Sequence, residues 1–203
     1  MTVAAAPAWE CVARSVDALL ALDEPAARAA LERIDVPGLL AERQSAMERY
    51  WGDGGVARGY RPPQPGRARE SVPPSRARAV LTRDRYTCRY SHCGRRTIAT
   101  VVLKRLGILF PDLLPCHRNW KPVETHALHW TSTASVEHVV PFPSGGTSAI
   151  ENLVTSCYLC NDVKNSIPLE VLGWSVAPIA DVEWDGLTGR VVQLDRAIAR
   201  LRP

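Results

Sequence analysis

Four of the six cysteines form two close pairs, a spacing typical of metal ligands. The pairs are Cys88/Cys93 and Cys157/Cys160. Two residues between Cys157 and Cys160 form the tight turn that places two thiolates on one tetrahedral ion. The turn between Cys88 and Cys93 is wider, so His92 could replace Cys93 as a ligand. The sequence predicts a structural Zn²⁺ held by the four cysteines, whose binding stabilises the fold. The alternative is four unrelated thiols, two of them simply buried.

A second group of residues has the chemistry needed to hydrolyse a phosphodiester. Glu137 and His138 lie in a β-branched segment, Asn152 follows His138 by 14 residues, and Asn161 follows Asn152 by nine. Histidine has an unperturbed pKa near ~6.5 and can accept a proton from water near neutral pH. Carboxylate and amide oxygens suit Mg²⁺ or Mn²⁺. Taken singly, Glu137 would be interpreted as a surface acid, His138 as a structural residue and Asn161 as a helix N-cap.

Together these motifs resemble the HNH, or ββα-metal, endonuclease family with a four-cysteine zinc ribbon. The matching motifs are Glu137-His138-Val139-Val140-Pro141, Gly145-Gly146, Asn152-Leu153 and Cys157-x-x-Cys160-Asn161 with Lys164. The resemblance covers roughly residues 76–174 and implies an α+β fold with a ββα-metal core held by a structural zinc. The sequence departs from the family pattern at Glu137, where Asp is more usual, and at Asn161, where a histidine is replaced. Both residues can supply an oxygen ligand.

The resemblance also implies a role for each motif residue. His138 is expected to be the general base, and Glu137 and Asn161 the ligands of one catalytic Mg²⁺ or Mn²⁺ ion. Asn152 is expected to bond the loop backbone and keep His138 oriented, and Lys164 to contact phosphate. The ion would stabilise the departing 3′ oxygen. The products would carry 5′-phosphate and 3′-hydroxyl ends.

Positive charge is concentrated in one part of the chain. The net charge is only +4, but residues 58–105 contain thirteen Lys and Arg against two acids. Such a stretch favours an anionic partner, for which a phosphate backbone is the usual candidate. For residues 58–75 a disordered basic linker is an equal alternative. The substrate is expected to be DNA, with RNA left open. The residues expected to contact it, besides Lys164, are Arg76, Arg78, Arg83, Arg85, Arg95 and Arg96.

Periodicity and composition divide the chain into four parts. Trp9, Val12, Val16 and Leu19 recur at helical spacing, and further helices are predicted to begin near Asp23 and at Pro37. The predicted parts are a helical module at 1–51, a Pro/Gly/Arg-rich linker at 52–75, a nuclease domain at 76–174 with an insertion at 97–130, and a C-terminal extension at 175–203. Within these parts we expect a helix over 75–85, a strand over 135–142, and a hairpin of segments 182–184 and 190–194 followed by a short helix.

Composition also limits the class of protein. The chain is 46% hydrophobic and 23% charged, as is usual for globular proteins, and it has no run of 18 apolar residues. No basic region precedes the N-terminal apolar stretch, which argues against a secretory signal. Cysteine pairs used as metal ligands fit a reducing compartment, so a cytoplasmic protein is expected.

Three functional hypotheses follow. The leading one is a DNA endonuclease, with restriction or anti-phage defence favoured as its setting. The second is a zinc ribbon that binds nucleic acid without cutting it, although such a module has no need of the Glu, His and Asn residues. The third is an effector or toxin nuclease activated by a partner, with the N-terminal helices as the surface for that partner or for dimerisation. A second metal at His126-x-x-His129, near Cys116-His117, is a further alternative to a buried or DNA-contacting role.

Overall fold

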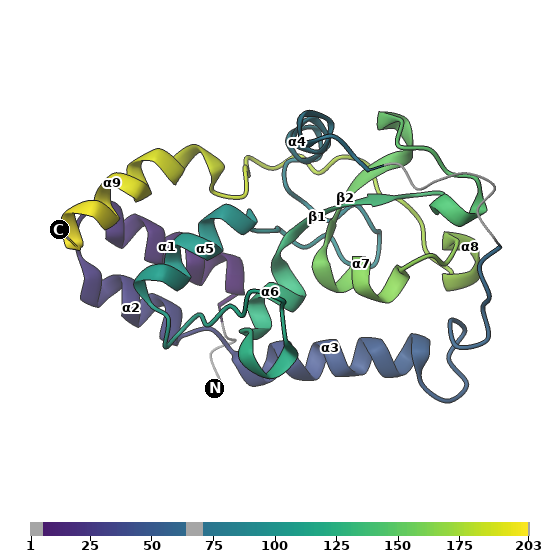
Figure 1. The fold of residues 1–203 in the computed structure, drawn as a ribbon, viewed down its shortest axis with the longest axis horizontal. Helices are drawn as coiled ribbons and strands as arrows, with labels where there is room; N and C mark the ends of the chain where they lie inside the picture. The colour runs from purple at the N-terminus through teal and green to yellow at the C-terminus, as the bar shows by residue number, and fades with distance from the viewer. Residues whose placement is uncertain (1–5, 64–70, 203) are drawn as a thin grey trace.

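The computed structural model describes residues 6–63 and 71–202 of the chain. In these ranges the chain forms helices and one small sheet (Figure 1). The elements are α1 (Ala8–Leu20), α2 (Glu24–Glu32), α3 (Val36–Trp51), α4 (Pro74–Arg83), α5 (Thr100–Leu109), α6 (Ala127–Ser132), β1 (Ala134–His138), β2 (Leu153–Cys157), α7 (Tyr158–Lys164), α8 (Leu169–Leu172) and α9 (Val191–Leu201), with 3₁₀ turns at Pro122–Glu124, Phe142–Ser144, Ile150–Asn152 and Thr188–Arg190. None of the described helices is long and apolar enough to cross a membrane.

The three N-terminal helices begin where the sequence predicts. The Asp23 side chain accepts a hydrogen bond from the Ala26 N–H at 2.9 Å and caps α2. Asp35 caps α3 in the same way through Gly38, with Pro37 in the first turn, so this helix begins one residue before the predicted proline. These caps satisfy amide groups that have no partner inside the helix.

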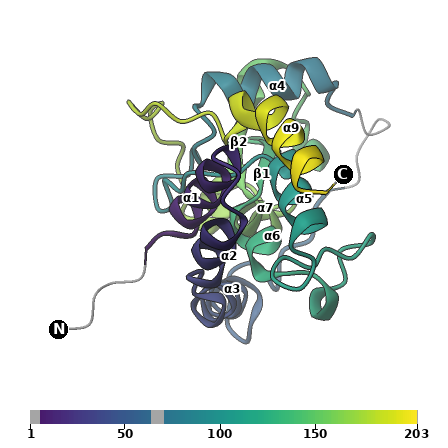
Figure 2. The same ribbon diagram turned by 90° about the vertical axis from the view of Figure 1, so that its left-hand side faces the viewer.

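The first hydrophobic core joins segments that are far apart in the sequence. Helices α1, α2, α5 and α9 lie together at one end of the molecule (Figure 2). Val16, Leu106 and Leu194 are each fully buried there and come from α1, α5 and α9. The N-terminal helices therefore share a core with part of the predicted insertion and with the C-terminal helix. The division into four parts remains a prediction.

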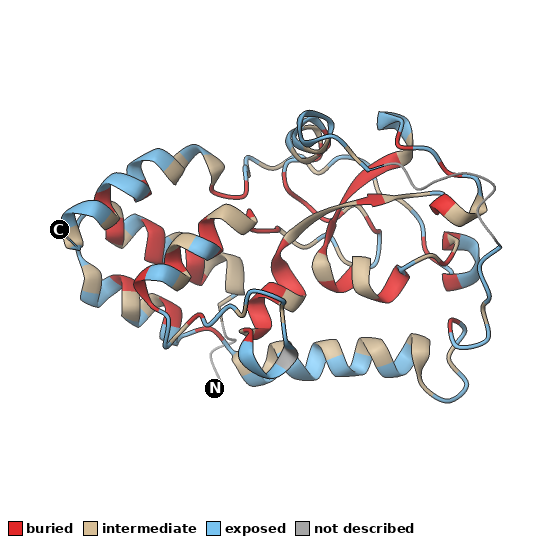
Figure 3. Ribbon diagram, in the orientation of Figure 1, coloured by how far each residue is buried: buried red, intermediate tan, exposed pale blue. Residues whose placement is uncertain are grey.

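A second core lies beneath the sheet, around the paired cysteines. It contains Tyr90, Val154 and Val163, all buried. Helix α3 packs along α6 and α7, where the Trp51 indole N–H donates to the Val163 carbonyl at 2.8 Å. Helix α3 itself carries no buried residue, and exposed and partly buried residues alternate along its length (Figure 3).

The sheet consists of β1 and β2, paired antiparallel, and α7 follows β2 directly. Ala134 pairs with Cys157 and His138 with Leu153. All five residues of β2 are buried. This arrangement confirms the α+β prediction and places a ββα unit at 134–164. Strand β1 is shorter than the predicted strand over 135–142 because regular pairing ends at His138.

The predicted C-terminal hairpin is wrong. Residues 182–184 form no strand, and residues 191–194 begin helix α9. The Asp185 side chain accepts hydrogen bonds from the Leu187 and Gly189 amides, which forms the turn that leads into the helix. Leu194 and Ile198 then recur at helical spacing and pack on the first core. The helical spacing of Leu194 and Ile198 therefore determines the structure of this segment, and the turn at Asp185 leads into a helix instead of joining two strands.

Candidate functional site

The four paired cysteines meet at one point. Their Sγ atoms all lie within 4.8 Å of one another, and those of Cys93 and Cys157 are 3.8 Å apart. A tetrahedral zinc with bonds of about 2.3 Å to sulfur separates its ligand atoms by about 3.8 Å. The site could therefore hold zinc. The group of four ligand atoms contains Cys93 and not His92, although the His92 Nε2 lies 3.6 Å from the Cys160 Sγ.

Two turns bring these thiols together. Cys157 ends β2 and caps α7, where its Sγ accepts from the Cys160 N–H at 3.5 Å. On the other side, Cys88 pairs through its amide with the Arg95 carbonyl at 2.8 Å. Gly94 has φ +59°, a conformation that glycine adopts without strain, and it closes the wider turn.

The thiols of this cluster influence each other's ionisation strongly. The pKa of Cys93 is lowered, first by its hydrogen bond with Cys157 and then by those with Cys160 and Cys88. The pKa of Cys160 is raised, first by its hydrogen bond with Cys157, with burial adding to the effect. Four thiolates so close together repel one another unless a cation lies among them. Such a donor set suits a soft or borderline metal such as zinc.

Glu137, His138 and Asn161 line one cleft beside residues 141–143. Neighbouring strand residues normally point to opposite faces. Here the buried Glu137 carboxylate turns back along its own backbone, and its Oε1 accepts from the His138 N–H at 3.1 Å. Because β1 ends at His138, both side chains reach the same cleft. Asn161 reaches it from α7, directly after Cys160.

The His138 ring is held from the loop that precedes β2. Its Nε2 lies 3.1 Å from the Ser148 Oγ. The Ser148 carbonyl in turn accepts from the Arg76 guanidinium at 2.6 Å, which connects this loop to α4. The sequence offered no signal for Ser148, because a serine in a Gly-containing loop is unremarkable without the contact.

Asn152 closes the loop between the strands with both ends of its amide. Its Oδ1 accepts from the Val140 N–H at 2.8 Å, and its Nδ2 donates to the carbonyls of Val140 at 3.0 Å and Thr147 at 2.8 Å. A Cβ at Gly146 would lie 1.8 Å from the Val140 oxygen, so only glycine fits there. The hydrogen bonds to the loop are those expected of Asn152.

Lys164 does not lie where a phosphate could reach it. Its side chain is fully buried, and its Nζ donates to the Glu137 Oε1 at 3.1 Å. The expectation that it contacts phosphate is therefore corrected. A fully buried ammonium requires a charged partner, and Glu137 provides one.

The predicted nucleic-acid contacts separate into two groups. Arg76, Arg78 and Arg85 are exposed on α4 and the turn after it. Arg76 also donates to the Ser148 carbonyl, and Arg83, Arg95 and Arg96 are less exposed and contact other protein side chains. Arg95 pairs with Glu42, and the Arg96 guanidinium lies 4.3 Å from the centre of the Trp9 ring.

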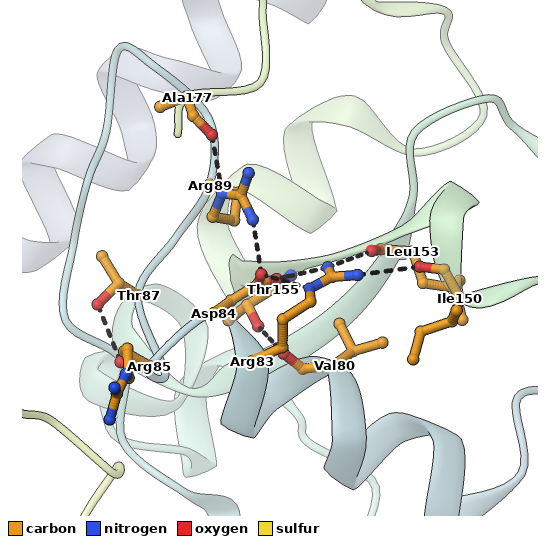
Figure 4. Close-up of polar contacts among 10 residues, drawn as sticks. All are labelled: Val80, Arg83, Asp84, Arg85, Thr87, Arg89, Ile150, Leu153, Thr155 and Ala177. Atoms are coloured by element: carbon orange, nitrogen blue, oxygen red, sulfur yellow. Dashed lines mark hydrogen bonds and ion pairs between the residues drawn. The ribbon is translucent and has the colours of Figure 1, made fainter. Parts of the chain in front are cut away.

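Arg83 belongs to a buried network that the sequence did not reveal (Figure 4). At the centre of the network is Asp84, which is fully buried. Its Oδ1 accepts from Arg83 at 2.8 Å and from Arg89 at 2.6 Å, and its Oδ2 accepts from Arg83 at 3.0 Å and from the Thr155 N–H of β2 at 2.7 Å. Arg83 also donates to the Leu153 carbonyl at 2.7 Å. The network therefore ties α4 to β2.

The pKa of Asp84 reflects this environment. Burial acts to raise the pKa, but hydrogen bonds from Arg83 and from the Thr155 amide, together with the positive charge of Arg83, lower it below its ordinary value. Asp84 is one of only two acids in the arginine-rich stretch of the chain. The presence of this acid among so many arginines was the only feature of the sequence that could have indicated the buried role of Asp84.

The histidines before β1 form no second metal centre, because among the described residues only the four cysteines bring three or more His, Cys, Asp or Glu ligand atoms together. His129 is fully buried, and burial, assisted by His126, lowers its pKa to about 4. Its ring packs edge-on against Trp120, with 5.5 Å between centroids. This agrees with a buried role for His129.

Residues 116–166 match the family model of the HNH endonucleases. The matched segment contains the β1–β2–α7 unit, the cleft residues Glu137, His138 and Asn161, and the loop residue Asn152. The chain therefore contains an HNH endonuclease domain. HNH nucleases hydrolyse nucleic acids and generally depend on metal ions. No curated protein and no solved structure matches the chain.

Proposed function

We propose that this chain is a metal-dependent endonuclease that hydrolyses DNA phosphodiester bonds. His138 is its general base, and Glu137 and Asn161 are the ligands of one Mg²⁺ or Mn²⁺ ion. The observation that carries the proposal is the single cleft in which these three side chains meet.

The donor set of the cleft fits a hard divalent cation. Glu137 offers carboxylate oxygen and Asn161 offers an amide oxygen, and such ions keep water for their remaining positions. An ion bound there would neutralise charge on the scissile phosphate and the leaving oxygen. His138 accepts the proton of the attacking water, with its ring oriented by Ser148.

The surrounding residues hold this geometry in place. Asn152 fixes the loop that follows β1, and Lys164 holds the Glu137 carboxylate from inside the protein. Positioning of this kind contributes to catalysis because the reacting groups are already arranged before the substrate binds.

The four cysteines hold a structural zinc in this proposal. Cys160 and Asn161 are consecutive residues in the first turns of α7. Fixing Cys157 and Cys160 on one ion therefore also fixes the position of Asn161. Zinc thus contributes to folding and, through α7, to the geometry of the cleft.

Arg76, Arg78 and Arg85 are proposed to contact the DNA backbone. They are exposed, and α4, which carries the first two, packs against both strands of the sheet. Restriction or anti-phage defence in the cytoplasm is the proposed setting, and the N-terminal helices are the proposed surface for a partner or a second copy.

The proposal is tested with an end-labelled DNA duplex incubated with the zinc-loaded protein and Mg²⁺ or Mn²⁺. Each expected cut leaves a 5′-phosphate and a 3′-hydroxyl, so DNA ligase should reseal it. Glu137→Gln and Asn161→Ala should each raise the metal concentration needed for half-maximal cutting. Cleavage that proceeds without a divalent ion would contradict the proposal. So would cleavage by both variants at the same metal concentration as the wild type requires.

A further inference from the structure

Two polar bridges connect β1 to α7 beside the cleft. The Asn161 Nδ2 donates to the Ser135 Oγ, and the Lys164 Nζ donates to the Glu137 Oε1. One bridge therefore ends at each proposed ligand of the catalytic metal. Neither Ser135 nor its bridge belongs to the sequence motif.

The spacing of the two elements explains why the bridges form side by side. Strand residues two apart share a face and are separated by about 6.6 Å along the strand. Helix residues three apart share a face and are separated by about 4.5 Å along the axis. Ser135 and Glu137 are two apart on β1, and Asn161 and Lys164 are three apart on α7.

The Ser135 bridge has a chemical consequence for Asn161. An asparagine amide has a donor end and an acceptor end of almost the same shape, and only the oxygen can bind a cation. The Ser135 hydroxyl accepts from Nδ2 and thereby keeps the nitrogen on the side of β1. The Oδ1 atom then points away from Ser135. Both residues are half-buried, so water competes only in part for this bond.

We propose that Ser135 is a positioning residue that presents the Asn161 oxygen, rather than its nitrogen, to a divalent cation. This inference rests on the proposed function, because it assumes that Asn161 is a ligand. Outer groups that orient a metal ligand typically change metal affinity by roughly 10- to 100-fold. Since Ser135 is half-buried, we expect the lower end of that range.

The test measures Mn²⁺ affinity rather than cleavage. The full-length, zinc-loaded protein with His138→Ala is titrated with Mn²⁺, and free Mn²⁺ is followed by electron paramagnetic resonance. Ser135→Ala should weaken Mn²⁺ binding about tenfold. Ser135→Thr keeps the hydroxyl and should restore most of the affinity. Ser91→Ala is the matched control, because the Ser91 hydroxyl bonds Ser175 outside the cleft.

A second variant shows whether Ser135→Ala acts through the orientation of the Asn161 amide or through a general effect on the structure. Asn161→Asp replaces the amide with a carboxylate, which has an oxygen at both ends and no donor end to misplace. In the Asn161→Asp background, Ser135→Ala should therefore change Mn²⁺ affinity less than about twofold, far below the typical effect of an orienting group. Zinc content and the urea unfolding midpoint should stay unchanged throughout.

Each outcome has a distinct meaning. Equal Mn²⁺ affinity in Ser135→Ala and its parent would overturn the inference while leaving the proposed function intact. An equal loss of affinity in the Asn161 and Asn161→Asp backgrounds would also overturn it, because the effect would then not depend on amide orientation. If Ser135→Ala fails to fold, Ser135→Cys takes its place in the same comparison. If the parent protein binds no Mn²⁺ at all, the proposed function itself fails.

Discussion

Replacing Asp84 with asparagine should destabilise the protein substantially. The substitution keeps the shape of the side chain but removes its charge and one of its acceptor oxygens. Each carboxylate oxygen accepts two hydrogen bonds, one of them always from Arg83. The amide nitrogen of asparagine would therefore face two donors in either orientation, and Arg89 would lose its charged partner.

The size of the effect follows from the burial of the group. Removing one partner of a buried ion pair typically costs about 3–5 kcal/mol because the other charge remains without compensation. Arg83 is 32% exposed and can recover part of its solvation, whereas Arg89 is 13% exposed and cannot. We therefore expect a loss of about 3 kcal/mol in the free energy of unfolding, at the low end of that range.

Urea unfolding followed by tryptophan fluorescence measures this loss. With an m-value of about 2 kcal/mol/M, the midpoint should fall by about 1.5 M. Asp112→Asn is the matched control, because Asp112 pairs with Arg28 at the exposed surface and its midpoint should hardly move. A midpoint for Asp84→Asn that also hardly moves would refute the account of Asp84 as the buried centre of the network.

The same variant has a predictable pH dependence. Because the folded pKa of Asp84 is lowered, its stabilising contribution is fully present above the unfolded pKa near ~3.9 and is lost as pH falls through the folded value. The difference in stability between wild type and Asp84→Asn should therefore be constant above about pH 5 and shrink below about pH 4. A difference that grows on acidification would contradict this assignment.

Three further substitutions test other parts of the account. Cys157→Ser should lose the bound zinc and unfold the ββα unit, measured by metal analysis and circular dichroism; retained zinc with a folded unit would argue against the four-cysteine site. Lys164→Met should lower the free energy of unfolding by about 3 kcal/mol, because it leaves the buried Glu137 without its ammonium partner. Urea unfolding should detect this loss. An unchanged midpoint would show that the ion pair does not stabilise the fold. Asn152→Ala should reduce the rate of single-turnover cleavage roughly tenfold to a hundredfold with zinc content unchanged, because the loop after His138 loses its hydrogen bonds to Asn152. An unaltered rate would show that the loop keeps its conformation without these hydrogen bonds.

The parts of the structure that the sequence could predict are those determined by local chemistry. Cys157 and Cys160 form their turn with two intervening residues, and Asp23 and the Asp35–Pro37 segment begin their helices with capping signals in adjacent positions. The ββα unit was predictable from the resemblance to the HNH family, whose motif residues here lie in one continuous segment from Glu137 to Lys164. In each case the physical determinant and its effect lie close together in the chain.

The features that the sequence could not predict depend on distant partners. Asp84 meets Thr155 across 71 positions, and Ser135 meets Asn161 across 26. A polar residue with such a partner looks the same in sequence as one that is solvated. Lys164 was expected to face phosphate for this reason, although its place on α7 turns it toward Glu137. Arg83, Arg95 and Arg96 were likewise expected at a surface.

We propose that the cleft formed by Glu137, His138 and Asn161 is where DNA is cut. The most direct measurement incubates supercoiled plasmid with the zinc-loaded protein and Mg²⁺ or Mn²⁺, beside His138→Ala and the matched control His117→Ala, whose position lies outside the cleft. We expect nicked or linear plasmid with wild type and His117→Ala, and intact plasmid with His138→Ala or with EDTA. Equal cleavage by His138→Ala, or a salt-dependent gel shift without cleavage by the wild type, would contradict this proposal.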